Sequence, residues 1–205
     1  WLGLFLKGAL HYIPHLNRTV DYNLLSEEVS SGFCIIEDKN DHVWYGGPSG
    51  LFLIDKKKAN ARPEKISPLR IFNLVQFNDS ILWAGTRKGS MFQINTRTLK
   101  VTSLPILPHT DLYVTYIYPD SHQRIWIGTD NNGLYVSDRN GSIIASYSKE
   151  QLGSNAIKGI IEDEMNNIWV GTGSGLCCIN PQTENIDRYT TADGLPINQF
   201  NYSSA

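Results

Sequence analysis

Short apolar runs separated by polar turns recur along the chain. The clearest set lies near the C-terminal end, with runs around residues 160–162, 168–172, 175–179 and 186–189. β-Branched residues, which favour strands, are frequent in these runs, and polar turns at 164–167 and 180–183 divide them. A helical periodicity of three or four residues is absent. The pattern predicts an all-β chain with four short antiparallel strands in each unit.

Five tryptophans place these units in one register. They follow one another at intervals of 43, 39, 43 and 43 residues, and a glycine stands two residues after each. A second glycine follows each tryptophan at six or seven residues. A fixed period in this range indicates a repeat architecture. The repeated pairs are Trp1 and Gly3, Trp44 and Gly46, Trp83 and Gly85, Trp126 and Gly128, and Trp169 and Gly171.

Four antiparallel strands in some forty residues are typical of one blade of a β-propeller. The tryptophan and its first glycine are two residues apart, so both lie on the same face of their strand. We expect the glycine to leave room for a neighbouring blade and the indole to fill the gap between blades. The chain is thus predicted to contain about five tryptophan-marked blades.

An aspartate stands six residues before the tryptophan in three repeats, as Asp38, Asp120 and Asp163, while Phe77 takes this place in the third repeat. Residues at one repeat position stand on different blades, so these carboxylates do not converge on a catalytic or metal centre. We expect them to cap turns. The run Lys56–Lys58 follows Asp55 and is interpreted as a solvated turn rather than a phosphate or glycan-sulfate patch.

Composition narrows the functional classes. The 205 residues are 41% hydrophobic and carry a formal charge of −2, which argues against a nucleic-acid partner bound through phosphate neutralisation. No run approaches the roughly 18 apolar residues of a membrane-spanning helix, so we expect no direct membrane insertion. The three cysteines Cys34, Cys177 and Cys178 suit neither a disulfide framework nor a zinc site. We expect them to be small apolar side chains in strands, and we expect no cofactor or metal.

The motif Asp-x5-Trp-x-Gly-Thr followed by Gly-Leu occurs at 120–134 and 163–176 and resembles the two-component regulator propeller repeats of sensors from gut Bacteroidetes. Leu4 and Gly47 depart from it in place of the threonine. The stretch 193–205 is similar to the link into the last blade of that family's propellers. The resemblance implies a periplasmic sensor domain of a hybrid two-component regulator whose parent is anchored in the inner membrane, responds to glycan fragments and signals to a histidine kinase.

The family usually builds seven blades of about 43 residues each, so we expect residues 1–205 to be one β-propeller segment, a slice of a larger ring. Its partners would then be the remaining blades, the downstream sensor domains and a second protomer in a homodimer. The chain begins at Trp1 without an initiator Met, which indicates a processed product or a fragment. The alternative is a closed five-bladed ring in which 200–202 pair beside 1–3.

Loops of a four-stranded blade alternate between two faces. The loops from strand two to three and from strand four to the next blade share one face. Carbohydrate recognition uses amide, carboxylate and guanidinium groups beside an exposed aromatic ring. On this face the candidate ligand-binding residues are Arg87, His109, Tyr113, Asp130 and Asn131. The alternative for each is an ordinary solvated loop residue.

These observations predict a non-catalytic sensor module that binds an oligosaccharide ligand. The alternative is a propeller-type carbohydrate-active enzyme, a lyase or glycosidase, because fold alone does not determine function. Such an enzyme needs convergent carboxylates, or a tyrosine with a carboxylate and an arginine cluster, and the sequence shows none outside the repeat positions. The Gly-His and Trp-Asp pairs of WD repeats and the longer docking motif of quinone dehydrogenases are absent.

Overall fold

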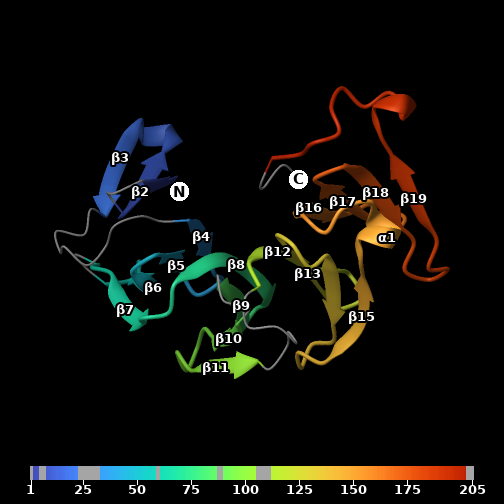
Figure 1. The fold of residues 1–205 in the computed structure, drawn as a ribbon. Coiled ribbons are helices and arrows are strands. Elements are labelled where there is room, and N and C mark those ends of the chain that lie inside the picture. The colour runs from blue at the N-terminus through green and yellow to red at the C-terminus, as the bar shows by residue number, and fades with distance from the viewer. Residues whose placement is uncertain are drawn as a thin grey trace. The chain divides into compact units, whose positions relative to one another are not determined.

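The computed structural model describes residues 2–4, 8–22, 33–58, 61–86, 90–104 and 112–201. Within these ranges it contains one three-stranded and four four-stranded antiparallel sheets (Figure 1). Each strand pairs with the next one along the chain, so every sheet is a meander. This confirms the predicted all-β architecture of four-stranded blades. The chain divides into two compact units, Trp1–Thr86 with Phe92–Ser103, and Arg87–Met91 with Leu104–Ala205.

The first unit holds the sheets formed by β1 to β11. Its three-stranded sheet consists of β1 (Leu2–Leu4), β2 (Gly8–Ile13) and β3 (Arg18–Tyr22), with a 3₁₀ turn at Pro14–Leu16. The next sheet consists of β4 (Cys34–Glu37), β5 (His42–Gly47), β6 (Gly50–Asp55) and β7 (Glu64–Ser67). The third consists of β8 (Ile71–Asn78), β9 (Ile81–Thr86), β10 (Met91–Asn95) and β11 (Val101–Leu104).

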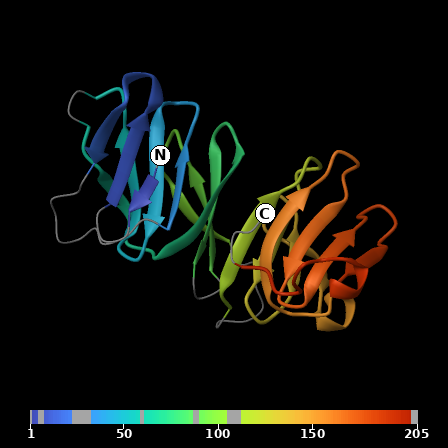
Figure 2. The ribbon, with the colours of Figure 1, turned by 90° about the horizontal axis from the view of Figure 1, so that it is seen from above.

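The second unit holds two complete sheets. One consists of β12 (Val114–Pro119), β13 (Ile125–Thr129), β14 (Leu134–Ser137) and β15 (Ile143–Tyr147). The other, coloured orange to red in Figure 2, consists of β16 (Ile157–Glu162), β17 (Ile168–Thr172), β18 (Gly175–Ile179) and β19 (Ile186–Tyr189). All four strands predicted for this last repeat are confirmed.

One short helix, α1 (Lys149–Leu152), joins β15 to β16, and a 3₁₀ turn at Thr191–Asp193 follows β19. The expectation of no helix misses α1 because one turn is too short to show a helical period. Its local signals are present in the sequence. Ser148 and Gln151 form a capping box, and Gly153 ends the helix in the left-handed conformation.

Two of the tryptophans, Trp44 and Trp126, fill the space between neighbouring sheets, as predicted. Trp44 of β5 is fully buried in a cluster with Ile71 and Leu82, which belong to the next sheet of the first unit. In the second unit Trp126 of β13 is buried in a cluster with Ile157 of the next sheet. Large aromatic side chains contribute much of the apolar area that such contacts bury. The repeated indole is therefore the main cohesive group between adjacent blades.

The repeated glycine makes the close approach of these sheets possible. A Cβ atom on Gly128 would lie 2.6 Å from Cγ2 of Ile157, which projects from the first strand of the next sheet. Gly46 stands in the same relation to Ile71, also at 2.6 Å. At Gly171 the neighbour is Phe200, whose nearest atom would be 3.4 Å away. The prediction that glycine leaves room for the next blade is confirmed at Gly46 and Gly128.

The other repeat positions vary in what surrounds them. Trp1 lies outside the described residues. Gly3 pairs with Ala9 in the β1–β2 ladder, and Gly85 with Asn73 in the β8–β9 ladder. Trp169 is half-buried and stacks on the ring of a tyrosine in β19, with ring centroids 5.7 Å apart.

The aspartate six residues before the tryptophan forms hydrogen bonds both to the turn after the first strand and to the indole in the core. Asp120 follows β12, and its Oδ1 atom accepts hydrogen bonds from the main-chain amides of His122 at 3.0 Å and Arg124 at 2.8 Å. Its Oδ2 atom accepts a hydrogen bond from Nε1 of Trp126 at 2.8 Å. One carboxylate thus closes the turn and satisfies the polar atom of a buried indole.

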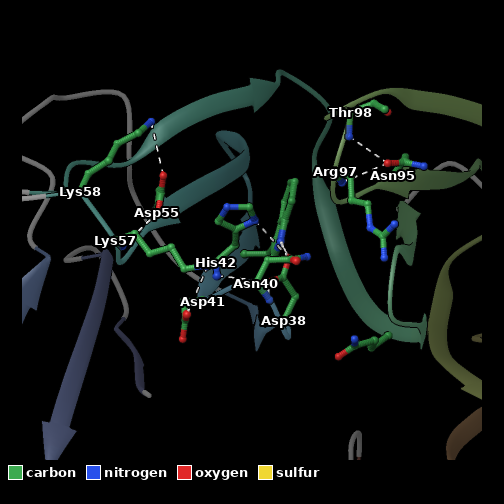
Figure 3. A network of polar contacts seen from close by, with 12 residues as sticks. Asp38, Asn40, Asp41, His42, Asp55, Lys57, Lys58, Asn95, Arg97 and Thr98 are labelled. Atoms are coloured by element: carbon green, nitrogen blue, oxygen red, sulfur yellow. Dashed lines mark hydrogen bonds and ion pairs between the residues drawn. The ribbon is translucent and has the colours of Figure 1, made fainter.

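The same arrangement recurs at the other two aspartates. Asp38 accepts hydrogen bonds from Nε1 of Trp44 at 2.9 Å and from the main-chain amide of His42 at 3.1 Å (Figure 3). Asp163 accepts one from Nε1 of Trp169 at 2.8 Å. Each aspartate stands in its own sheet, so the three carboxylates do not converge. Their hydrogen bonds to turn amides confirm the predicted turn-capping role. The bond to the indole is a second role that the sequence analysis did not predict.

The third repeat lacks this carboxylate. Phe77 takes its place and lies 6.3 Å from the ring of Trp83, centroid to centroid. Asn78 caps the turn instead, because its side-chain oxygen accepts from the amide of Ser80 at 2.9 Å. Within the described part of the chain, the buried Nε1 of Trp83 has no hydrogen-bond partner.

The indole bond predicts a pH-dependent stability. The hydrogen bond from Trp169 is the main cause that lowers the pKa of Asp163, and its two turn residues lower it further. Ionised Asp163 therefore stabilises the fold above its ordinary pKa of about 3.9, and this contribution is lost as the pH falls below that value. We expect Trp169→Phe to lose less stability than the wild type between pH 6 and pH 3 in urea unfolding. Trp83→Phe, whose indole meets no carboxylate, should keep the wild-type pH dependence; equal slopes in all three proteins would contradict the assignment.

The contacts around the repeat glycines predict that alanine at these positions lowers the free energy of unfolding by unequal amounts. Gly128→Ala places a methyl group against Ile157 and should lower the free energy of unfolding by about 1–3 kcal/mol, the usual cost of overpacking. Gly171→Ala meets only Phe200 at 3.4 Å and should cost less. Chemical denaturation of the two variants measures the difference, and a larger loss at Gly171 would contradict this packing.

Candidate ligand-binding surface

In each four-stranded sheet, one residue near the start of the first strand stands outside the regular pairing with the second strand. The register of β8, β12 and β16 shifts by one residue against the second strand, and the extra residues are Phe72, Thr115 and Lys158. Phe33 takes the same place before β4, where its amide donates to the carbonyl of Gly46 at 2.8 Å. All four stand eleven residues before the tryptophan of their repeat. We call this the bulge position.

The bulge position lies at a defined edge of each sheet. Thr115, for example, falls between the pairs Val114 with Thr129 and Tyr116 with Gly128, so it stands opposite the end of the second strand. That end leads into the loop between strands two and three. A bulge redirects a side chain away from the regular ladder. Within each sheet, the side chain at the bulge position therefore lies at the edge from which the loop between strands two and three leaves.

In the first unit the bulge position carries an aromatic pair. Phe33 and Phe72 come from adjacent sheets and stack with ring centroids 4.8 Å apart and an angle of 17° between the rings. Phe33 is 47% exposed. An exposed aromatic face of this kind binds apolar surface, including that of a sugar ring.

In the second unit the bulge position carries polar groups. Thr115 donates its hydroxyl hydrogen to the carbonyl of Ile157 at 2.7 Å and so joins the two sheets. Lys158 is 9% exposed, and its Nζ lies 3.3 Å from Oδ1 of Asp130. A buried ammonium group is tolerated when a carboxylate pairs with it. The pair fixes the position of the Asp130 side chain at the start of the loop between β13 and β14.

This ion pair lies beside two other predicted residues. The amide of Asp130 donates to the carbonyl of Tyr113 at 3.0 Å, and Tyr113 is 36% exposed. Asn131 is exposed and follows Asp130 in the same loop. The structure thus brings Tyr113, Asp130 and Asn131 together, as the sequence analysis placed them on one face. Arg87 and His109 lie outside the described residues.

Repeat residues shape the loop that holds these groups. Thr129 donates its hydroxyl hydrogen to the carbonyl of Gly133 at 2.7 Å and accepts from the amide of Asn132 at 3.0 Å. Gly133 has a φ of +78°, and a Cβ atom there would lie 2.2 Å from the carbonyl oxygen of Tyr147. Only glycine fits this close approach. The threonine and second glycine of the repeat are therefore loop-shaping residues.

The charged run at the opposite loop face is neutralised locally. Each lysine of Lys56–Lys58 pairs with a carboxylate: Lys56 with Glu37, Lys57 with Asp41 at 3.5 Å, and Lys58 with Asp55 at 3.7 Å. Figure 3 shows the last two pairs beside the Asp38 turn. Lys57 and Lys58 are exposed, and such surface pairs add little stability. The arrangement agrees with a solvated turn.

Cysteines and acidic groups form no further centre within the ranges that the structure describes. Cys34, Cys177 and Cys178 are free thiols in strands, as expected. Burial raises the pKa of Cys34 to about 12 and that of Cys177 to about 11, so both thiols stay protonated at neutral pH. Among the described residues, no group of three or more His, Cys, Asp or Glu is arranged to hold a metal ion.

Sequence reasoning missed the bulge residues Phe33, Phe72 and Lys158. The available signal was their constant offset of eleven residues from the tryptophan. The residue type at this offset differs from repeat to repeat, so a search for repeated residues passes over it.

None of the helices within the described ranges has the length and apolar character to cross a membrane.

Comparisons with known proteins agree with the repeat. Residues 109–131 and 151–174 match the family model described as two component regulator propeller. The curated protein Histidine kinase P4 of Formosa agariphila is 26% identical over 254 aligned residues, which cover 93% of this chain. The chain spans only 18% of the length of that relative.

Solved structures share the fold. The extracellular domain of a putative hybrid two component system from B. thetaiotaomicron has a TM-score of 0.77 at 22% identity, covering 97% of this chain and 28% of that one. The β-propeller domain of Cps50 (Swd1) from Myceliophteria thermophila has a TM-score of 0.66 at 13% identity, covering 89% and 65%. These likenesses confirm the β-propeller fold. Two stretches of the chain, residues 109–131 and 151–174, are thus similar to the repeats of the two component regulator propeller family.

Proposed function

We propose that this chain is part of the extracytoplasmic sensor region of a hybrid two-component regulator, and that it binds a glycan-derived ligand without transforming it. The observation that carries the proposal is the bulge position. At this position one unit presents a stacked aromatic pair, and the other presents a buried lysine that pairs with the half-buried Asp130. The names of its relatives, a histidine kinase and an extracellular domain of a hybrid system, support the sensor role and the location outside the cytoplasm.

The aromatic pair supplies an apolar contact for a sugar ring. Phe33 and Phe72 already stack on one another, so their rings lose little freedom when a ligand arrives. The exposed face of Phe33 removes the apolar face of a pyranose from water. This contact does not depend on the identity of the hydroxyl groups, so it provides affinity for sugars as a class.

The polar groups of the second unit form a separate candidate contact for a ligand within that unit. Lys158 holds the Asp130 carboxylate in place, and Tyr113 and Asn131 stand beside it. Carboxylates accept and amides both donate and accept hydrogen bonds, which matches the pattern of sugar hydroxyl groups. A ligand whose hydroxyl groups match this set of donors and acceptors makes more hydrogen bonds than one whose hydroxyl groups do not.

Signalling follows when the ligand binds one arrangement of the partner domains better than another. The partners are the remaining blades, the downstream sensor domains and a second protomer in a homodimer. A ligand shifts such an equilibrium only by the difference in its affinity for the two arrangements. The propeller therefore needs no chemistry of its own, and its parent's kinase, anchored in the inner membrane, performs the catalytic step.

Oligosaccharide binding tests the proposal directly. A panel of oligosaccharides is screened by thermal shift, because a ligand that binds the native state raises the melting temperature. For a ligand so identified, Phe72→Ala should weaken binding about tenfold, the loss of about 1.4 kcal/mol expected for one aromatic contact. Tyr12→Ala removes another exposed aromatic ring of the first unit and should leave the affinity unchanged. Equal effects of the two substitutions would contradict a role for the bulge position.

The bound ligand should survive incubation with the protein. We expect the purified chain to release no smaller or unsaturated product from any oligosaccharide of the panel, as followed by chromatography over hours. Cleavage that persists in Tyr12→Ala but is lost on Asp130→Asn would show a carbohydrate-active enzyme instead of a sensor.

A further inference from the structure

A pocket of about 370 Å³ opens in the second unit between α1, β18 and β19. These elements are labelled together in Figure 1. The pocket lies on the third and fourth strands of its sheet, whereas the bulge position lies on the first. Small-molecule sites usually occupy about 300–1,000 Å³, so this pocket has room for a molecule of the size of one sugar.

The inner wall of the pocket is apolar and rigid. Leu152 and Cys177 are each 1% exposed, and the thiol of Cys177 donates to the carbonyl of Leu152 at 3.3 Å. This bond holds the end of α1 against β18. The rest of the apolar lining comes from Leu176 and Tyr189, which are both half-buried. A wall of this kind suits the ring of a ligand rather than its hydroxyl groups.

Arg188 of β19 adds a positively charged guanidinium group to the lining of the pocket. It pairs with Cys177 in the β18–β19 ladder and is the one charged residue among the described residues that line the pocket. A Cβ atom on Gly153 would lie 3.5 Å from Nη1 of Arg188. Gly153 ends α1 with a φ of +80°, and the guanidinium lies beside this glycine.

The acidic groups near this pocket have other partners. Asp193 accepts from the amide of Thr190 at 2.9 Å, and Glu150 accepts from the hydroxyl of Ser148. Across residues 112–201 no ion pair or hydrogen bond joins Arg188 to a carboxylate. Ser174, in the exposed turn before β18, adds a hydroxyl group to the lining. A guanidinium with a nearby hydroxyl recognises planar carboxylates and sulfate oxygens through paired hydrogen bonds.

We propose that this pocket binds a sugar-sized molecule through an anionic substituent, a carboxylate or a sulfate ester. Arg188 pairs with the anion, Ser174 donates a hydrogen bond to it, and the wall of Leu152 and Cys177 contacts the ring. The inference does not rest on the sensor role, because the pocket and its charge belong to the second unit alone. It adds a site for acidic sugars to a surface whose other candidate groups suit neutral ones.

The test is an NMR titration of the full 205-residue chain with amide detection. The probes are methyl β-glucuronide, glucose 6-sulfate, the neutral methyl β-glucoside and inorganic sulfate. We expect the amides of Gly153, Gly175 and Thr190 to shift with one or both of the anionic sugars and not with the glucoside. The first two probes distinguish a carboxylate from a sulfate ester.

Variants identify the group that binds. Arg188→Gln should weaken binding of the anionic sugar about tenfold or more, since a hydrogen-bonded charge pair is lost. Arg139→Gln removes an equal charge from an exposed turn of the same unit and serves as the matched control. Ser174→Glu places a carboxylate at the pocket and should weaken binding similarly. The amide spectrum of each variant reports at the same time whether it is folded.

Three outcomes would overturn the proposal. They are equal shifts with the neutral glucoside, equal losses in Arg188→Gln and Arg139→Gln, and binding of inorganic sulfate as tight as that of glucose 6-sulfate. A negative result in the NMR titration of the pocket does not affect the binding test at Phe72. A negative result at Phe72 does not affect the amide shifts expected at the pocket. The two proposals are therefore separately testable.

Discussion

The hydrogen bond from a buried indole to an aspartate six residues earlier is the interaction on which each regular blade depends. A tryptophan between two sheets removes a large apolar area from water, but its N–H group loses solvent at the same time. In the Asp120 and Trp126 pair the carboxylate that closes the first turn also accepts this hydrogen. Local turn geometry and packing between sheets are thus set by one side chain.

The third repeat shows what happens without that carboxylate. Trp83 is as buried as Trp44 and Trp126, yet its Nε1 atom has no partner among the described residues, and Phe77 offers only ring contact. An unsatisfied buried donor costs about 1–3 kcal/mol. Asn78 still closes the turn, so the strand pairing survives while the coupling to the core is lost. Turn closure and indole satisfaction are therefore separable functions that the other repeats combine.

Features tied to the repeat period were predictable from the sequence, because one constraint acts on every copy. The strands 168–172 and 186–189, the glycine beside Ile157 and the turn-capping role of Asp163 are of this kind. Features that depend on a single copy were not. The helix α1 is one turn long, and Lys158 shares only an offset with its counterparts. The pocket at Arg188 needs three segments that meet only in the folded unit, so no local pattern predicts it.

The bulge position holds the candidate ligand-binding side chains, whereas the tryptophan and glycine positions pack neighbouring sheets together. Substitution of a residue inside the ladder disturbs both its cross-strand neighbours and the core beneath, and most such changes destabilise the protein. The extra residue of β8, β12 or β16 stands outside the regular paired positions of its ladder. The three positions hold phenylalanine, threonine and lysine, whereas the tryptophan and its first glycine are the same in all three repeats. Under the proposed function, a substitution at this position can change the ligand contact of one blade and leave the packing of its tryptophan and glycine in place.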